Sequence, residues 1–420
     1  MTRREALKNA SIAAALFGLP AQKVAKAATP GLPDASLYDR DPETYWTKIR
    51  EEQFLLPHWR VFLQNGSLGI APRPVIDAVV DYLTRSAALN LEEYPRWGYE
   101  TLDQHRTAMA EYVGCKKEEL AFTHNATEAL SIIASGIDLK AGDEVIMTDQ
   151  EHPSGKSGWL EKQARYGITV REVKIPLPPK SPEQLTDIMI SAIGPRTRVL
   201  FFSGITTSTG LHFPVREICE AARAKGIITV VDGAHMQGQV PLRISDFGCD
   251  YYAGSPHKWL FAPAGSGLLY VREENLDKLW PLVVTAGWDD KKLGAARYMM
   301  MGTNNRAIFE GMLAGLKFHQ QIGSDRVYKR MHQLARMARE KAAAIPYMHL
   351  LTPDDDRLYG SLVTFEIKGK TDEQLKPVGE IFQKQKIWTL WGQRVRLSVH
   401  IHTRPSDVDV FFNTVREVLG

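Results

Sequence analysis

Lys258 and Asp232 are the residues whose types and setting most clearly suggest covalent chemistry in this chain. The lysine follows a short apolar segment, and the aspartate directly follows the apolar run of residues 227–231. A lysine amine can form a Schiff base with an aldehyde, and a carboxylate can keep a pyridine nitrogen protonated so that the ring absorbs the electrons of a carbanion. Either residue alone would be an ordinary surface lysine or turn aspartate. Together, in this order, they predict a site for pyridoxal 5'-phosphate.

Two groups of residues suit the phosphate of such a cofactor. Ser255 and His257 stand beside the lysine. Ala126 and Thr127 follow a predicted strand and open a predicted helix, where free backbone N–H groups and the helix dipole favour an anion. The alternative is a plain helix cap, in which Asn125 or Thr127 satisfies the first N–H groups of the helix.

Polar residues after other strands are candidates for contacts with the cofactor ring. His152 is expected to stack on the ring face opposite the lysine. Ser203 and Thr207 are expected to bond the phenolic oxygen or the substrate, and His235 lies in the turn after Asp232. The alternative for each is ordinary loop chemistry.

The substrate end of the site is assigned to Arg396. Planar, bidentate recognition of a carboxylate favours arginine over lysine. Arg394 lies two residues earlier on the same predicted strand and is a competitor, and a surface salt bridge is the alternative for either residue. Asn65 and Gly66, in a glycine-containing turn where backbone can approach a ligand, are further substrate-binding candidates.

No metal site is predicted. His400 and His402 are spaced for one face of a strand, but no third ligand stands near them. The chain has three cysteines without C-x-x-C spacing, which indicates neither a zinc site nor a disulfide framework. We expect buried thiols.

The composition and the pattern of apolar runs favour an α/β fold. The chain has 420 residues, 44% hydrophobic and 24% charged, and its net charge of +3 gives no reason to expect a nucleic-acid partner. Short apolar runs alternate with helical patterns, which predicts a largely parallel sheet. The expected strands of this sheet are residues 120–123, 144–147, 198–202, 227–231 and 267–271. A helix over residues 74–85 should pack its face of Val75, Ile76, Val79, Val80 and Leu83 inward.

Four parts of the chain are expected. They are a twin-arginine signal peptide (1–27), an N-terminal segment that contributes to the small domain and the site entrance (28–70), a cofactor-binding large domain (71–315) and a small α+β C-terminal domain (316–420).

The signal prediction rests on the first 27 residues. Arg3 and Arg4 precede a weakly apolar run at 10–19, and Ala25-Lys26-Ala27 fits signal-peptidase cleavage. The run is short for a membrane anchor, and an amphipathic basic helix is a further alternative. Twin-arginine export carries folded proteins, so the cofactor could be loaded before the chain reaches the periplasm.

Several motifs together resemble the class V aminotransferase family of pyridoxal-phosphate fold type I, in particular its isopenicillin N epimerase-like branch. They are residues 125–129, 151–152, 232–235, 255–259, 302–303 and 396–398. The resemblance implies a mainly parallel seven-stranded sheet flanked by helices. It also implies that Lys258 forms the Schiff base, that Asp232 pairs with the ring nitrogen and that Arg396 anchors the carboxylate. It further implies a homodimer in which Gly302 and Thr303 contact the partner's phosphate, although a plain turn is the alternative.

One departure from the family narrows the reaction. Cysteine desulfurases carry a cysteine shortly before the position of Arg396, and residues 381–393 contain none. With the export signal, the chain resembles periplasmic enzymes that tailor the siderophore pyoverdine. The expected reaction is transamination or oxidative deamination or decarboxylation of an amino acid or peptide siderophore. The alternatives are an amino-acid epimerase and a non-catalytic binding module.

Overall fold

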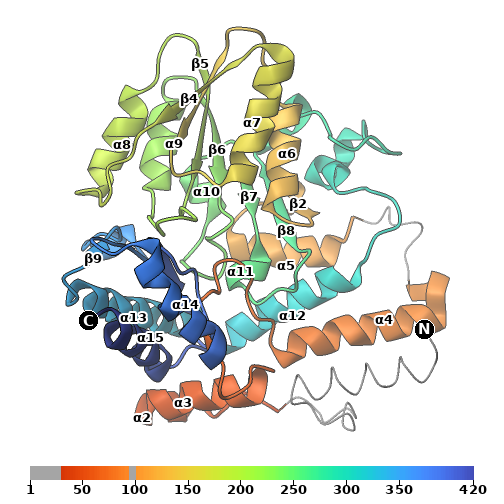
Figure 1. The fold of residues 1–420 in the computed structure, drawn as a ribbon. Coiled ribbons are helices and arrows are strands. Elements are labelled where there is room, and N and C mark those ends of the chain that lie inside the picture. Colours follow the sequence, from red (N-terminus) through yellow and green to blue (C-terminus); the bar gives the residue numbers. More distant parts are fainter. Residues whose placement is uncertain (1–29, 94–100) are drawn as a thin grey trace, which may run out of the picture.

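The larger part of the molecule is built on a seven-stranded sheet (Figure 1). The computed structural model describes residues 30–93 and 101–420, so the expected signal peptide lies outside the described residues. All neighbouring strands are parallel except β8, which runs antiparallel to β7 and β2. The strand order is β2 (Leu120–Thr123), β8 (Gly267–Val271), β7 (Tyr251–Gly254), β6 (Ile228–Asp232), β5 (Thr197–Ser203), β3 (Glu144–Thr148) and β4 (Thr169–Val173).

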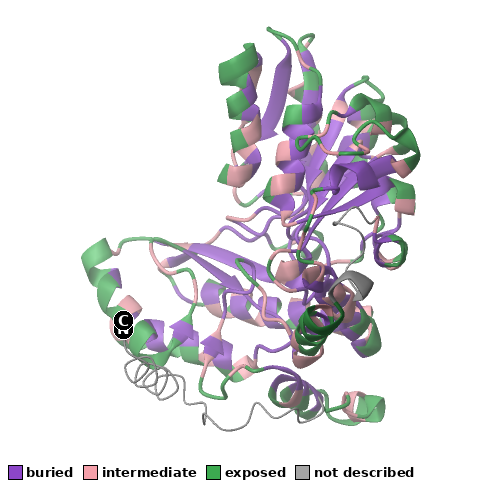
Figure 2. Cartoon of the chain, turned by 90° about the vertical axis from the view of Figure 1, so that its right-hand side faces the viewer, coloured by how far each residue is buried: buried purple, intermediate pink, exposed green. Residues whose placement is uncertain are grey.

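Helices cover both faces of this sheet, which explains why its central strands are apolar runs without alternation. In Figure 1, α6 (Ala126–Gly136) and α7 (Pro153–Tyr166) lie on one side of the strands. On the other side lie α8 (Pro182–Ser191) and α9 (Val215–Arg223). Figure 2 shows the strands themselves as buried, and every residue of β2, β3, β7 and β8 is buried.

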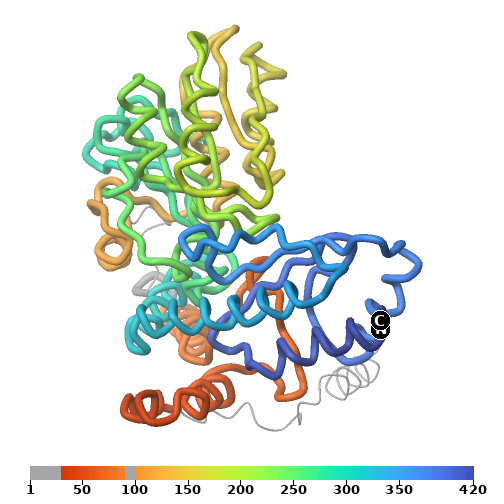
Figure 3. Tube along the Cα trace, turned by 90° about the vertical axis from the view of Figure 1, so that its left-hand side faces the viewer, coloured from red at the N-terminus to blue at the C-terminus, as the bar shows by residue number. Residues whose placement is uncertain are grey.

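The smaller part contains a three-stranded antiparallel sheet of order β12-β10-β9. Its strands are β9 (Met348–Leu350), β10 (Leu362–Ile367) and β12 (Arg394–Ser398), and its helices are α13 (Ser324–Ala343), α14 (Asp372–Gln385) and α15 (Pro405–Leu419). The N-terminal strand β1 (Val61–Phe62) pairs in parallel with β11 (Ile387–Trp388). Figure 3 shows the N-terminal helices α2 (Ala35–Arg40) and α3 (Pro42–Lys48) at the lower edge of the molecule, mostly to one side of this C-terminal part, and Glu43 of α3 pairs with Arg330 of α13.

Two hydrophobic cores correspond to the two parts. The larger core surrounds the seven-stranded sheet and extends along α12 (Ala307–Ile322) and into α13 as far as Met331. The smaller core begins in the same helix at Leu334 and includes Val61 and Leu63 of the N-terminal segment. Helix α13 therefore contributes to both cores, and the division of the chain after residue 315 stays a proposal.

The fold prediction is confirmed, and one detail of it is wrong. The expected helix at 74–85 is α4 (Arg73–Glu93), and its inward face contains Val75 and Tyr82. Val80 and Leu83, expected to pack inward, are about half exposed, because at 3.6 residues per turn Leu83 lies about 100° and Val80 about 160° round the helix from Tyr82. Within the described ranges, no helix is long and apolar enough to cross a bilayer.

Candidate active site

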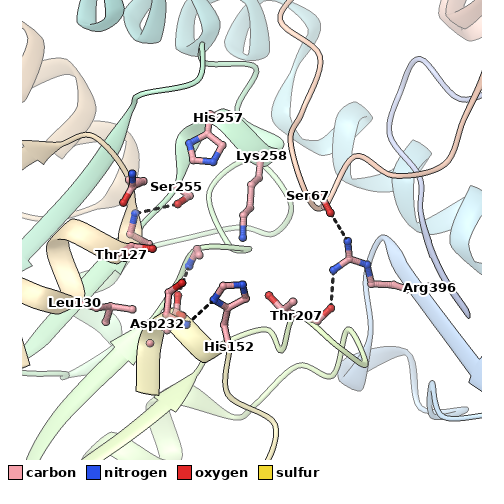
Figure 4. Close-up of a pocket in the computed structure, with 16 residues that line it drawn as sticks. Ser67, Thr127, Leu130, His152, Thr207, Asp232, Ser255, His257, Lys258 and Arg396 are labelled. Carbon is pink, nitrogen blue, oxygen red and sulfur yellow. Dashed lines mark hydrogen bonds between the residues drawn. The ribbon is translucent and has the colours of Figure 1, made fainter. Parts of the chain in front are cut away.

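A cavity of about 270 Å³ opens where the carboxyl ends of β2, β3, β5, β6 and β7 meet (Figure 4). Ligands of open α/β sheets bind at this edge because the following loops and helix N-termini converge there. The cavity is lined by Gly66, Ser67, Asn125, Ala126, Thr127, Leu130, His152, Ser154, Gly155, Thr207, Asp232, Ala234, Ser255, His257, Lys258 and Arg396. Most residues predicted from the sequence to form the site are therefore brought together.

Lys258 enters the cavity from α11 (Pro256–Trp259), a short helix that directly follows β7. In Figure 4 its side chain extends toward Asp232 and His152 from the opposite wall. Its Nζ lies 2.9 Å from Nε2 of His235. Burial lowers the pKa of Lys258 to about 8, against the attraction of Asp232, so a large fraction of the amine is neutral and nucleophilic near that pH.

The backbone of this lysine is fixed by donors from other segments. The last carbonyls of a short helix have no partner inside the helix and need one outside it. The donors are the Gly69 N–H to His257 (3.0 Å), the Asn65 side-chain amide to Lys258 (2.7 Å) and His400 Nε2 to Trp259 (3.1 Å). A Cβ at position 69 would lie 2.3 Å from the Lys258 oxygen, so the close approach requires glycine there.

Asp232 ends β6 and is almost fully buried. One carboxylate oxygen accepts a hydrogen bond of 2.9 Å from the backbone of Ala234. Burial raises the pKa of Asp232, and Lys258 and His152 act in the opposite direction. A buried carboxylate with a raised pKa is suited to share a proton with a ring nitrogen.

His152 caps the N-terminus of α7, on the wall that faces Lys258 in Figure 4. Its Nδ1 accepts a hydrogen bond of 3.2 Å from the backbone of Ser154, so a neutral ring carries its proton on Nε2. Burial and the nearby Lys258 lower the pKa of His152. The ring is therefore held in one orientation, neutral, across the cavity from the lysine.

Some of the residues predicted to bind the phosphate form hydrogen bonds with each other instead. The backbone N–H of Ala126 donates to the hydroxyl of Ser255 (3.1 Å), and Asn125 caps α6, as the alternative reading expected. The Ser255 hydroxyl still has its own proton to donate, and Thr127 and His257 line the same wall. This wall can hold an anion, with Ala126 serving mainly to position Ser255.

Arg396 lies at the other end of the cavity and is 4% exposed. It donates to the backbone carbonyl of Thr207 (2.8 Å), to the hydroxyl of Ser67 (2.9 Å) and to the side chain of Gln64 (3.2 Å). Burial lowers its pKa to about 10, which leaves it a cation at neutral pH. These bonds hold the guanidinium against neutral oxygens, so its charge is available to a carboxylate.

The structure separates Arg396 from its competitor. The Arg394 side chain is 46% exposed and pairs at 2.8 Å with Glu366, its register partner on β10. The two arginines point to the same face of the strand, but their side chains have different surroundings.

Five predicted site residues do not line the cavity. Ser203 donates its hydroxyl to the carboxylate of Glu151, and Asn65 bonds the Lys258 carbonyl and His402 instead of reaching into the open space. His235 is 1% exposed and lies beside the lysine amine. Gly302 and Thr303 lie outside the cavity of this chain, and their contact with a neighbouring subunit stays a prediction.

Sequence reasoning also missed residues of the cavity wall. Ser67 follows Gly66, Ser154 and Gly155 come two and three residues after His152, and Leu130 lies one helical turn beyond Ala126. Chain neighbours and the i, i+4 spacing of a helix could have indicated all four.

Glu151, which precedes His152, is a further buried acid next to the cavity but does not line it. Its carboxylate accepts hydrogen bonds from the hydroxyls of Thr148 and Ser203. Burial raises its pKa to about 7, and the nearby Asp232 contributes in the same direction. The sequence pattern gave no sign of this environment.

His400 and His402 have structural partners. Their rings stack with centroids 5.5 Å apart, and their Nε2 atoms bond the Trp259 carbonyl and Asn65. Over residues 30–93 and 101–420, no group of three or more His, Cys, Asp or Glu side chains is arranged to hold a metal ion.

The chain matches the family model Aminotransferase class-V over residues 61–411. It therefore belongs to the class-V aminotransferase family and is a pyridoxal-phosphate-dependent enzyme, which confirms the family, enzyme and cofactor expectations. The alternative of a non-catalytic module is thereby overturned.

Two curated relatives are similar over most of their length. The isopenicillin N epimerase of Streptomyces clavuligerus is 31% identical over 89% of this chain and 98% of its own. That of Amycolatopsis lactamdurans is 34% identical over 89% of this chain and 96% of its own.

Solved structures share the fold. A complex of the cystine C-S lyase C-DES with its product cysteine persulfide has a TM-score of 0.76 and 24% identity, covering 86% of this chain and 98% of that one. An apo cysteine desulfurase from Thermococcus onnurineus NA1 has a TM-score of 0.75 and 20% identity, covering 89% and 98%.

Proposed function

We propose that this enzyme inverts the configuration at the α-carbon of an amino acid, free or within a peptide, that presents both an α-amino group and an α-carboxylate. The observation that carries the proposal is the convergence of Lys258, Asp232 and Arg396 on one cavity. The resemblance to two isopenicillin N epimerases supports inversion over transamination, which was our first expectation from the sequence.

The residues of the cavity fit pyridoxal phosphate. Lys258 offers a partly neutral amine for the covalent link, and Asp232 offers a buried carboxylate for the ring nitrogen. Ser255, Thr127 and the N-terminus of α6 offer donors for the phosphate. When bound, the cofactor withdraws electrons from the α-carbon and weakens its bonds.

Arg396 is proposed to bind the substrate carboxylate and so decide which bond is weakened. A bond to the α-carbon breaks most readily when it lies perpendicular to the cofactor ring, so orientation of the substrate selects the reaction. Ser67 and the Thr207 carbonyl fix the guanidinium that sets this orientation.

Inversion needs proton-transfer groups on both faces of the α-carbon. Lys258, once its amine is released, can take the proton from one face. His152 is the histidine on the wall that faces Lys258, and we assign it the second face. Its neutral ring carries the proton on Nε2, so a proton can leave Nε2 only after Nδ1 has taken one up in place of the Ser154 hydrogen bond.

Transamination, or oxidative deamination or decarboxylation, in the maturation of a siderophore such as pyoverdine is the second candidate. The observation that favours it is the twin-arginine pattern at Arg3 and Arg4, which leads us to propose export to the periplasm by the twin-arginine machinery. A fusion of residues 1–35 to a reporter that is active only after folded export would test this proposal, and failure of Arg3→Lys/Arg4→Lys to reduce export would contradict it.

One assay separates the two reactions. The purified enzyme is incubated in D2O with single enantiomers of α-amino acids and of peptides with a free α-amino acid end. Inversion predicts the other enantiomer, deuterium at the α-carbon and full retention of nitrogen. Release of a keto acid or CO2, with configuration otherwise retained, would contradict inversion and favour the second candidate.

We further propose a homodimer, as expected from the family resemblance. Val80 and Leu83 of α4, together with Trp280 and Val284, are large apolar side chains exposed on the single chain. Light scattering coupled to size exclusion tests this proposal, and a monomer with bound cofactor would contradict it.

A further inference from the structure

Trp259, the residue after the site lysine, donates its indole N–H to Nδ1 of His235 at 3.2 Å. An indole nitrogen can only donate, so Nδ1 of His235 must accept and carries no proton. Burial, followed by the nearby Lys258, lowers the pKa of His235 well below its ordinary value, so the ring is neutral. Its single ring proton is therefore on Nε2.

This Nε2–H faces the lysine. Nε2 lies 2.9 Å from the Lys258 amine and 2.8 Å from the Thr207 hydroxyl. A neutral amine has a lone pair that can accept the proton, whereas an ammonium group has only donors. In this tautomer Nε2 has no lone pair, so it cannot accept a hydrogen bond from an ammonium at Lys258, whichever of the two neighbours receives its own proton.

We propose that Trp259 is a positioning residue that locks His235 in its Nε2–H tautomer and thereby favours the neutral amine of Lys258. Trp259 is suited to this task because it is fully buried and its ring stacks on His400, with centroids 5.8 Å apart and planes 18° apart. The fixed tautomer of His235 acts in addition to the burial of Lys258. The inference rests on the proposed role of Lys258.

Other charged groups also act on the lysine. Asp232, at the end of β6, favours the ammonium form, and Arg396 of β12 opposes it. His152 and His257 lie on the neighbouring walls and are themselves disfavoured as cations by Lys258. Because none of these contacts involves the indole, replacing Trp259 isolates the contribution of the tautomer.

The test uses Trp259→Phe in the full-length chain without cofactor. Competitive acetylation with acetic anhydride between pH 6 and pH 10, read by mass spectrometry of the peptide that contains Lys258, gives the midpoint of its titration. We expect the midpoint of Trp259→Phe to rise by about 0.5 to 1 pH unit, the shift that one neutral hydrogen bond produces. Trp391→Phe is the matched control, because its indole donates to the Leu375 carbonyl in the small sheet region, and its midpoint should equal that of the parent chain.

A folded Trp259→Phe with an unchanged or lower midpoint would overturn the inference. If that variant does not fold, ¹⁵N spectra of the parent chain with labelled histidine show which ring nitrogen of His235 carries the proton. The His235 signals are identified by their loss in His235→Gln. A proton on Nε2 alone between pH 6 and pH 9 supports the lock, and a proton on Nδ1 overturns it. Covalent loading of pyridoxal phosphate is scored separately, so its failure would count against the proposed function and leave the tautomer result readable.

Discussion

The side-chain amide of Asn65 donates a hydrogen bond of 2.7 Å to the backbone carbonyl of Lys258, which joins the N-terminal segment to the residue at the centre of the site. The oxygen of the same amide faces Nε2 of His402 at 3.2 Å. The amide nitrogen and the amide oxygen of Asn65 thus both have hydrogen-bond partners, and the nitrogen fixes the backbone of α11. Asn65 is predicted to act on cofactor binding through the lysine backbone, not through the substrate.

Asn65→Ala should therefore weaken cofactor binding and stability together. Removing the amide leaves a buried carbonyl without its donor, which costs about 1 to 3 kcal/mol. Thermal unfolding measures the stability, and absorbance titration with pyridoxal phosphate measures the affinity. Asn275→Ala is the control, because that amide bonds Asp250 away from the cavity. Equal cofactor affinity in the two variants would refute the positioning role.

Arg396→Ala should lower kcat/KM by about 30-fold, chiefly through KM. The expectation follows from the loss of charge-assisted bonds worth about 2 kcal/mol, at about 1.4 kcal/mol per tenfold change. Arg396→Lys should recover only part of the loss, since a lysine cannot bind a carboxylate in a bidentate manner. The control is Arg394→Ala, which removes the exposed pair with Glu366 and should leave the kinetics unchanged. The reverse pattern would make Arg394 the carboxylate anchor.

Glu151→Gln should change the pH dependence of stability. The pKa of Glu151 in the folded chain is about 7 and its ordinary value is 4.5, so the folded state holds an extra proton between these two pH values. The free energy of unfolding should consequently fall as the pH rises through this window, by about 3 kcal/mol from this group. Glutamine removes the titration, so the curve of the variant should be flatter there.

Urea unfolding of the cofactor-free chain at pH 4.5, 5.5, 6.5 and 7.5 provides the measurement. Glu161→Gln, which alters an exposed carboxylate paired with Arg165, is expected to leave the slope of the parent chain intact. Parallel curves for Glu151→Gln and the parent chain would show that Glu151 titrates near its ordinary value.

The predictable parts of the fold and the site are those that depend on short, contiguous stretches of sequence. Strands such as β2 and β8 are apolar runs bounded by turns, and Asp232 and Lys258 stand directly after such runs. The carboxyl ends of parallel strands meet at one edge of a sheet, so residues that follow several strands could be assigned to a common site.

The parts that were not predictable depend on contacts between distant segments. Nothing near Asn65 in the chain shows that its amide meets the Lys258 carbonyl, or that Ser203 is taken by Glu151. Arg394 and Arg396 share a strand period, but Arg394 pairs with Glu366 of the neighbouring strand β10, whereas Arg396 is buried against the distant Thr207 and Ser67.

The most direct test of the account is to locate the covalent attachment of the cofactor. The purified enzyme, loaded with pyridoxal phosphate, is reduced with borohydride, digested and examined by mass spectrometry. We predict a phosphopyridoxyl group on Lys258 in the parent chain and no such adduct in Lys258→Ala. An adduct on another lysine of the parent chain, with position 258 unmodified, would contradict the account.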